Sequence, residues 1–349
     1  MTNKKFDVVV IGGGQSGLAC GYYLRRTDLN YIILDDQENA GGAWLQTWDS
    51  LKLFSPAEHS SLPGWLMPKD VEEYPTKKHV IKYLQAYEKR YNLPIKRPVC
   101  VRSVTKNGHK FIILTDHEEL EAKTVISATG TWKKPFIPDY EGIESFNGLQ
   151  LHSAHYKSPK QIEGNKVLIV GGGNSGAQIL AEVSKSHLTT WVTLKDPKFL
   201  PDDVDGRYLF EFATRQYKAR LAGEKIEPVG TLGDVVMVES VKEARSRDDL
   251  KAVRPFRALY KKGVIWENGT KERFDAIIWC TGFKSALDHL SDFQEKGRIP
   301  TQGTRARNVK GLWLVGYGNW TGYASATLIG VGRTARQTIK EVNEYLGDQ

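Results

Sequence analysis

The chain has 349 residues, of which 40% are hydrophobic and 26% charged, and its formal net charge is +8. At about 150 residues per domain, this length predicts two or three domains. The composition excludes a long disordered, collagen-like or coiled-coil chain. The densest basic stretch, residues 242–262, has no zinc finger, RNP signature or continuous basic arm, so we expect no nucleic-acid partner.

The three cysteines, Cys20, Cys100 and Cys280, are widely spaced and form no C-x-x-C pair. We therefore expect neither a disulfide framework nor a metal site, and the dithiol chemistry of disulfide reductases is excluded. No apolar run approaches the roughly 18 residues of a membrane span. An N-terminal stretch similar to a signal peptide is interrupted by Asp7 and by the glycines that begin at Gly12. These features predict a cytoplasmic protein with no membrane contact.

The first predicted elements are a strand at residues 6–11, a glycine-rich turn, a helix and a second strand. Short, continuous apolar runs are typical of strands buried on both faces, which belong to parallel sheets. The turn reads Gly12-x-Gly14-x-x-Gly17, and its glycines allow a tight turn and a close approach of the backbone to a pyrophosphate. Asp35 ends the second strand, 18 positions after the last glycine, where an acid accepts ribose hydroxyls. This order predicts a dinucleotide site rather than a purely structural turn.

Further elements follow along the chain. The sequence predicts helices at residues 76–91 and 327–346, and strands at 31–34, 110–115, 124–128, 166–170, 275–280 and 311–315. The segments 133–148 and 157–164 contain proline and glycine and are predicted to connect modules.

Residues 165–196 repeat the pattern of residues 6–36, with an apolar strand, the turn Gly171-x-Gly173-x-x-Gly176, a helix and a second apolar strand. Two such units predict an α/β fold with two doubly wound, Rossmann-like dinucleotide-binding domains. Two dinucleotide sites without a dithiol indicate one bound flavin and one shuttling nicotinamide.

The acid that follows the first turn has no counterpart after the second. Eighteen positions after Gly176 stands Leu194, with Thr193, Lys195 and Asp196 beside it. A cation here recognises the 2′-phosphate of NADPH, whereas an acid favours NADH. Lys195 and Asp196 favour opposite coenzymes, so both coenzymes remain candidates. The alternative for Lys195 is an ordinary solvated lysine.

The most specific motif of the chain precedes the second turn. It reads Phe146-x-Gly148-x-x-x-His152-x-x-x-Tyr156 and matches the FxGxxxHxxx(Y/W/F) signature of the group B flavin monooxygenases. The chain resembles this family, which includes flavin-containing and Baeyer–Villiger monooxygenases, over essentially its whole length. It is most similar to short bacterial members that accept NADH as well as NADPH, and to flavin monooxygenases of arsenic-resistance operons. Further matching segments are Gly41-Gly42-x-Trp44, Ala128-Thr129-Gly130, Gly173-Asn174-Ser175, Phe199-Leu200-Pro201, Cys280-Thr281-Gly282 and Gly316–Gly318.

The resemblance implies a discontinuous FAD-binding domain, residues 1–155 plus 283–349, with an NAD(P)H-binding domain, residues 156–282, inserted into it. It implies that FAD is bound by Gly12, Gly14, Gln15, Ser16, Gly17, Asp35, Gly42, Trp44, Val101, Thr129, Gly130, Asn319 and Thr327. It implies that NADPH or NADH is bound by Gly171, Gly173, Asn174, Ser175, Gly176, Thr193, Lys195, Thr281 and Gly282.

Two positions depart from the family pattern. Many members place an asparagine above the flavin where this chain has Phe54, which cannot donate a hydrogen bond. The usual Gly-Asp pair near the C-terminus reads Gly318-Asn319, and the amide of Asn319 can still hydrogen-bond to the ribityl chain. Trp44 and Phe54 are the aromatic residues that we expect beside the flavin, although aromatic residues most often serve packing alone.

His152 and Cys280 each allow two interpretations. His152 can be a catalytic residue, since histidine titrates near neutrality, or a linker residue whose hydrogen bonds hold two domains in register. Cys280 can be a redox thiol or a buried structural one. The structural interpretation is favoured for both residues, and no catalytic residue is assigned.

The resemblance implies an NAD(P)H-dependent enzyme that activates dioxygen as a flavin hydroperoxide and oxygenates a small molecule. A sulfide, an amine or trivalent arsenic would be the nucleophile, or a ketone would undergo Baeyer–Villiger oxidation. One alternative is an NAD(P)H oxidase or flavin reductase without oxygen transfer, which Phe54 favours. Another is a redox-sensing or scaffold protein that binds both nucleotides without turnover. The oligomeric state stays open, with a homodimer among the alternatives.

Overall fold

The structure is a computed structural model that describes residues 4–221 and 233–348. The chain divides into two compact units. Unit 1 comprises Met1–Leu45, Pro56–Lys133 and Ser285–Gln349, and unit 2 comprises Gln46–Ser55 and Lys134–Lys284. The changes between units thus differ from the limits at residues 155 and 282 that the sequence suggested, and the assignment of a cofactor to each domain stays a prediction.

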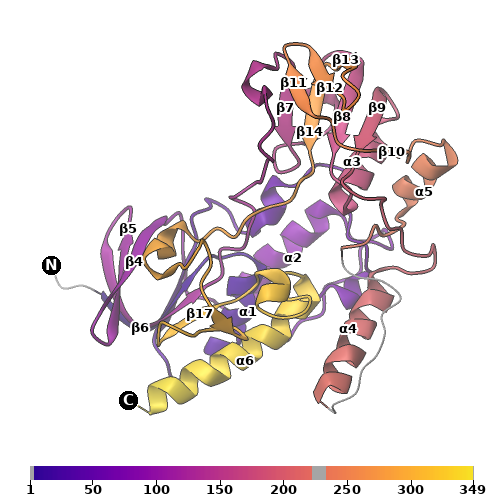
Figure 1. Ribbon diagram of the computed structural model, residues 1–349. Helices are drawn as coiled ribbons and strands as arrows, with labels where there is room; N and C mark the ends of the chain where they lie inside the picture. Colours follow the sequence, from indigo (N-terminus) through magenta and orange to yellow (C-terminus); the bar gives the residue numbers. More distant parts are fainter. Residues whose placement is uncertain (1–3, 222–232, 349) are drawn as a thin grey trace. The chain divides into compact units, whose positions relative to one another are not determined.

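Unit 1 is built around one large sheet (Figure 1). Its main path runs in the order β15-β16-β17-β6-β1-β2-β3, and an antiparallel pair, β4 and β5, extends from β6. The strands are β1 (Lys4–Ile11), β2 (Tyr31–Leu34), β3 (Ile95–Lys96), β4 (Val101–Asn107), β5 (Lys110–Thr115), β6 (Glu119–Ser127), β15 (Thr301–Gln302), β16 (Arg305–Ala306) and β17 (Leu312–Leu314).

The centre of this sheet is parallel because β1 lies between two parallel neighbours. Val8 of β1 pairs with Tyr31 of β2 on one side and with Thr124 of β6 on the other. The last four residues of β1 are all buried, as the continuous apolar run predicted. The predicted α/β class with doubly wound dinucleotide-binding units is confirmed.

The helices of unit 1 are α1 (Gln15–Leu24), α2 (Lys77–Arg90) and α6 (Leu328–Gly347), and α6 lies alongside α1 (Figure 1). Threonine side chains start two of them: the hydroxyl of Thr76 accepts a hydrogen bond from the His79 amide, and that of Thr327 accepts one from the Gly330 amide. Short 3₁₀ turns complete the unit: η1 (Gly42–Gln46), which runs into unit 2, η2 (Ala57–His59), η5 (Asp288–Phe293) and η6 (Gly318–Trp320).

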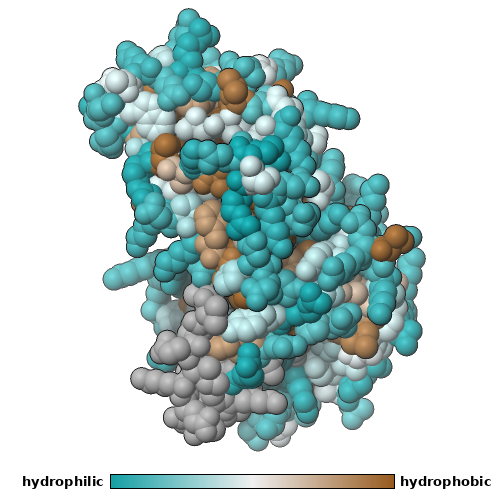
Figure 2. Space-filling view, turned by 90° about the vertical axis from the view of Figure 1, so that its right-hand side faces the viewer, coloured by the Kyte–Doolittle hydropathy of each residue, from teal (hydrophilic) through white to brown (hydrophobic). Residues whose placement is uncertain are grey.

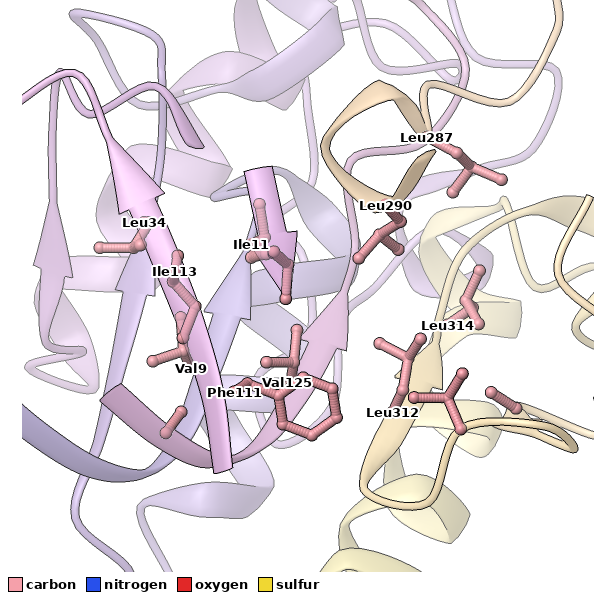
Figure 3. Packing of buried hydrophobic residues seen from close by; sticks show 14 of the residues in the cluster. Val9, Ile11, Leu34, Phe111, Ile113, Val125, Leu287, Leu290, Leu312 and Leu314 are labelled. Atoms are coloured by element: carbon pink, nitrogen blue, oxygen red, sulfur yellow. The ribbon is translucent and has the colours of Figure 1, made fainter. Parts of the chain in front are cut away.

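One hydrophobic core joins the strands of unit 1 to the 3₁₀ turn η5. Val9 and Ile11 of β1 meet Phe111 and Ile113 of β5, with Leu290 of η5 in the same cluster (Figure 3). Leu312 and Leu314 of β17 close it at the C-terminal side (Figure 3). The strand that leads into the β1–α1 turn is therefore packed against segments that lie far apart in the sequence.

Unit 2 contains a second parallel sheet, in the order β10-β9-β8-β14-β7, and a small antiparallel sheet, β11-β12-β13. The strands are β7 (Leu149–His152), β8 (Lys166–Val170), β9 (Leu188–Val192), β10 (Ala252–Val253), β11 (Ala258–Tyr260), β12 (Gly263–Ile265), β13 (Lys271–Arg273) and β14 (Ala276–Trp279). The helices are α3 (Asn174–Val183), α4 (Gly206–Leu221) and α5 (Glu239–Ser246), with 3₁₀ turns η3 (Ile143–Ser145) and η4 (Pro159–Gln161).

Residues 46–55 leave unit 1 and form part of unit 2. Trp48 lies in the core of unit 2 beside Tyr156, and the Asp49 amide donates a hydrogen bond of 2.9 Å to the Lys157 carbonyl. The Gly206 amide donates one of 2.7 Å to the carbonyl of Phe54. This segment is an integral part of the second unit.

The surface of the described residues is largely hydrophilic on the face drawn in Figure 2, with scattered apolar side chains. Within residues 4–221 and 233–348, no helix combines the length and apolar composition that crossing a bilayer requires.

Candidate dinucleotide-binding sites

The first glycine turn joins β1 to α1 in unit 1 and leaves no room for side chains. Gly12 has a φ of +110°, and a Cβ there would lie 2.6 Å from the carbonyl oxygen of Ala128. A Cβ on Gly17 would lie 1.8 Å from the Gly12 carbonyl oxygen. The first turn of α1 has no acidic residue, so its free N–H groups and the helix dipole favour an anion.

Asp35 lies directly behind this turn. It is 3% exposed, and a Cβ on Gly13 would come within 2.6 Å of its carboxylate oxygen. Arg97 donates to the carboxylate through Nε at 3.0 Å, and the Gln37 amide donates at 3.3 Å. Burial raises the pKa of Asp35 above its usual value, and the guanidinium of Arg97 offsets only part of that rise. The predicted ribose acceptor thus lies at the turn, where Arg97 favours its charged form.

Arg97 is a residue that the sequence did not single out. It stands 62 positions from Asp35, and its guanidinium also donates to both carboxylate oxygens of Glu88 at 2.9 Å. Only the pairing of β2 with β3, which ends at Lys96, brings it to the end of β2.

Several predicted FAD residues come together at the start of α1. The indole of Trp44 donates to the Gln15 side-chain oxygen at 3.0 Å, and the Gln15 amide donates to the carbonyl of Ala326 at 2.6 Å. A Cβ on Gly42 would lie 2.8 Å from the Gly14 Cα.

Two more predicted FAD residues lie where the C-terminal part of unit 1 meets the start of α1. Thr327, which caps α6, follows Ala326 directly. Ser16 also lies here, because a Cβ on Gly316 would meet its hydroxyl at 2.0 Å.

A buried polar network holds the predicted residues Thr129 and Gly130 at the end of β6. The Tyr317 hydroxyl lies 2.7 Å from the hydroxyls of both Ser127 and Thr129. Thr129 in turn donates to the Ala286 carbonyl at 2.7 Å, and Nε2 of His289 lies 3.1 Å from the Ser127 hydroxyl. Burial lowers the pKa of His289 to about 4, so the imidazole is neutral near pH 7. The sequence pattern included Tyr317 only as part of the segment Gly316–Gly318 and assigned it no role, and no local pattern marks His289.

Two predicted FAD residues lie at other places in unit 1. Val101 begins β4 and packs against the core of the unit. Asn319 lies exposed in η6, directly after Gly318, whose φ is +70°. Their contacts with FAD stay predictions.

The second glycine turn, between β8 and α3 in unit 2, repeats the geometry of the first. Gly171 has a φ of +132°, and a Cβ there would lie 2.2 Å from the Cys280 carbonyl oxygen. A Cβ on Gly176 would lie 2.0 Å from the Gly171 carbonyl oxygen, whereas a Cβ on Gly173 would have no neighbour within 4 Å in the described parts of the chain. The first turn of α3 also lacks an acidic residue. The backbone at Gly173 is therefore open to a ligand.

The side chain of Asn174 forms hydrogen bonds to a neighbouring backbone segment beside this turn. Its amide donates to the Asp234 carbonyl at 2.9 Å, and its oxygen accepts from the Val236 amide at 2.9 Å. The predicted contact of Asn174 with the coenzyme, like that of the adjacent Ser175, stays a prediction.

The end of β9 carries an unsatisfied polar atom. Thr193 is 2% exposed, and its buried hydroxyl has no hydrogen-bond partner among the residues that the structure describes. Its methyl group would lie 3.3 Å from a Cβ on Gly172, so the hydroxyl stands beside the glycine turn. An unpaired buried hydroxyl costs free energy, which a polar ligand at this turn would recover. Lys195 is exposed two positions further along.

A second cation at this edge escaped the sequence analysis. Arg254 forms an ion pair with Asp196, although 58 positions separate them. It follows β10, a strand of two residues that is too short to be recognised from its pattern.

His152 and Thr281 hold the strand ends near the second turn. Nδ1 of His152 accepts from the Ala154 amide at 3.1 Å, so Nε2 carries the proton that it donates to the Gly282 carbonyl at 3.0 Å. Burial lowers the pKa of His152. Thr281 donates its hydroxyl to the Phe136 carbonyl. Both ring nitrogens of His152 are thus engaged within unit 2, so these two bonds hold strand ends of one unit. A role of His152 in holding two domains in register stays a prediction.

Two further residues of unit 2 bear on the sequence interpretation. Cys280 is buried and burial raises the pKa of its thiol, which favours a structural role. The ring of Phe54 packs against Phe210, with 6.1 Å between the ring centroids, in a cluster with Leu200 and Val236. A flavin-facing role for Phe54 stays a prediction. Among the residues that the structure describes, no group of three or more His, Cys, Asp or Glu side chains could hold a metal ion.

The fold and the two turns define an oxidoreductase with two dinucleotide-binding units, and comparisons with known proteins agree. The family model described as pyridine nucleotide-disulphide oxidoreductase matches residues 9–316. The flavin-containing monooxygenase of Stenotrophomonas maltophilia is 48% identical, with a TM-score of 0.90 over 98% of this chain and 99% of that chain. An uncharacterized oxidoreductase of Bacillus subtilis, CzcO, is 33% identical over 97% of this chain and 99% of its own. An indole-3-pyruvate monooxygenase of Arabidopsis thaliana, YUCCA6, is 27% identical over 88% of this chain and 85% of its own.

The chain belongs to the pyridine nucleotide-disulphide oxidoreductase family and, within it, to the NAD(P)H-dependent flavin monooxygenases. The resemblance inferred from the sequence motifs is thereby confirmed, and the protein is an enzyme.

Proposed function

We propose that the protein uses FAD and either NADPH or NADH to transfer one oxygen atom of dioxygen to a soft nucleophile, most simply a sulfide. The observation that carries the proposal is the pair of glycine turns, one in each unit, that lead into helix starts without acidic residues. Such helix starts bind the pyrophosphate of a dinucleotide. FAD belongs to unit 1, and the nicotinamide coenzyme belongs to unit 2.

The bound flavin supplies the redox chemistry, from oxidation of the nicotinamide to activation of dioxygen. The side chains of the protein bind and orient FAD and the nicotinamide coenzyme. Asp35 accepts the ribose hydroxyls of FAD, and the Gln15–Trp44 pair braces the start of α1. Thr129 is held at its place by Tyr317, and the unpaired hydroxyl of Thr193 offers a hydrogen bond to the coenzyme.

The 48% sequence identity to the flavin-containing monooxygenase of Stenotrophomonas maltophilia supports the oxygenase assignment. An amine, trivalent arsenic or a ketone would be an alternative substrate class. We place the reaction in the cytoplasm, with dioxygen and a small molecule as the partners and with neither a membrane nor a nucleic acid.

The second candidate function is an NAD(P)H oxidase or flavin reductase that releases peroxide. It is favoured by Phe54, whose side chain is apolar and packs within an apolar cluster of unit 2. An enzyme without a hydrogen-bond donor at the flavin would lose its oxygenating power and release peroxide instead.

The test is a turnover balance on the purified yellow protein, with about one noncovalent FAD per chain. Sulfoxide and peroxide are measured per NADPH and per NADH consumed, with methyl phenyl sulfide as the probe. Sulfoxide close to the amount of coenzyme consumed supports the monooxygenase. Peroxide alone with every substrate class supports the oxidase, and a protein without flavin or without coenzyme consumption would overturn both.

A further inference from the structure

The carboxyl ends of β9 and β10 lie side by side at the second glycine turn. The two strands are parallel, with Val253 opposite Val192, and the Thr193 amide donates to the Val253 carbonyl at 3.0 Å. Arg254 follows Val253 directly. Thr193 contacts the turn at Gly172, and its amide is bonded to the residue that precedes Arg254. The backbone of Arg254 therefore lies near the second glycine turn.

The guanidinium of Arg254 is paired with the carboxylate of Asp196, two residues beyond Leu194. The Asp196 side chain is 88% exposed and that of Arg254 is 51% exposed. An exposed ion pair of this kind adds little stability, since water screens both charges. The pair is therefore easily exchanged for a stronger partner.

We propose that this ion pair sets the coenzyme preference: Arg254 receives the 2′-phosphate of NADPH, and Asp196 competes with that phosphate for the guanidinium. The inference rests on the proposed function of unit 2 and adds the residues that decide between its two coenzymes. It also gives Asp196 a defined partner, Arg254. From the sequence alone, Asp196 and Lys195 favoured opposite coenzymes.

The chemistry of the groups supports the exchange. A guanidinium offers a planar fork of donors that matches a phosphate in two-point contact, whereas a lysine offers a point charge. A phosphate monoester carries a charge of about −1.5 to −2 near neutrality, so it outcompetes a single carboxylate. With NADH there is no phosphate, and Asp196 keeps Arg254 neutralised beside the ribose. A masked cation of this kind allows both coenzymes to be used.

The experiment measures binding of two probes to the FAD-saturated protein by calorimetry. The probes are 2′,5′-ADP, which carries the 2′-phosphate, and 5′-AMP, which lacks it. Asp196→Asn is expected to lower the Kd of 2′,5′-ADP by about three- to tenfold, because it removes the competitor. Arg254→Ala is expected to raise that Kd by about tenfold or more. The Kd of 5′-AMP should change by less than about twofold in both variants.

A double variant separates competition from a general charge effect. In the Arg254→Ala background, Asp196→Asn should leave the Kd of 2′,5′-ADP nearly unchanged, because no guanidinium remains to be unmasked. The matched control is Asp248→Asn, which removes the same charge from an exposed ion pair with Lys251 in unit 2. This control should leave both probes unaffected.

Three outcomes would overturn the inference. Arg254→Ala could leave the Kd of 2′,5′-ADP unchanged, Asp196→Asn could act no more strongly than Asp248→Asn, or its effect could be the same with and without Arg254. If the wild-type protein bound neither probe, the proposed coenzyme site of unit 2 would fail as well. If both probes bind and only the variants behave otherwise, the coenzyme site stands and this inference alone fails.

Discussion

Asp35→Ala removes the buried carboxylate that receives the FAD ribose in the proposed function. A hydrogen bond to a charged group contributes about 1.5–3 kcal/mol. Loss of the ribose contact alone should therefore weaken FAD binding by about ten- to 150-fold. The same substitution also removes a partner of Arg97, so its effect on binding must be separated from its effect on stability.

The cost in stability should be smaller than for a carboxylate that is the sole partner of a buried cation. Removing one member of a buried ion pair costs about 3–5 kcal/mol when the other charge is left alone. Arg97 keeps Glu88, to which its guanidinium donates two hydrogen bonds of 2.9 Å through one nitrogen. We expect the free energy of unfolding of the FAD-free protein to fall by less than about 3 kcal/mol.

The assay removes FAD, then measures its rebinding by quenching of flavin fluorescence and the unfolding of the FAD-free protein in urea. Asp275→Ala is the matched control, because this carboxylate accepts from the Asn165 and Lys166 amides at 2.8 and 2.9 Å in unit 2. It should lower stability and leave the FAD Kd unchanged. If Asp35→Ala lowers stability while the FAD Kd stays at the wild-type value, Asp35 serves only to position Arg97 and does not bind the ribose.

Three further predictions concern buried or exposed polar groups. Because burial lowers the pKa of His289 from 6.5 to about 4, the unfolded chain takes up a proton that the folded chain does not. The free energy of unfolding should therefore fall as the pH falls from 6.5 to about 4. His289→Gln should reduce the difference between the unfolding free energies measured in urea at pH 7 and pH 4.5. Thr193→Val removes a hydroxyl that has no partner within residues 4–221 and 233–348, so it should leave stability unchanged or higher while raising the Kd of both coenzymes about tenfold. Unchanged coenzyme affinity would disprove the contact. Lys195→Ala should raise KM for NADPH more than for NADH in steady-state kinetics, and equal losses would show that Lys195 does not contact the 2′-phosphate.

The parts of the fold that sequence reasoning predicts well are those encoded locally. The β1–α1–β2 and β8–α3–β9 units each lie within about 30 consecutive residues, where strand, turn and helix leave a continuous pattern. The first half of β6 illustrates the limit. Residues 119–123 alternate between buried and more exposed side chains, and only the fully buried second half was recognised as a strand.

The parts of the site that sequence reasoning misses are formed by residues distant in the chain. Arg97 reaches Asp35 across 62 positions, and Arg254 reaches Asp196 across 58. Tyr317 reaches Thr129 across 188 positions, through the pairing of β17 with β6. Nothing in the spacing of such residues marks them, because the sheet order alone brings them together.

The membership of residues 46–55 in unit 2 has a consequence for making chimaeras. The chain passes between the units four times, after Leu45, Ser55, Lys133 and Lys284. A fragment of residues 134–284 would lack Trp48, and loss of a buried tryptophan from a core costs about 3–5 kcal/mol. Unit 1, in turn, cannot complete its sheet until β17 has been synthesised after all of unit 2. An exchange of coenzyme units between relatives must therefore transplant two separate gene segments, with the short one encoding Gln46–Ser55.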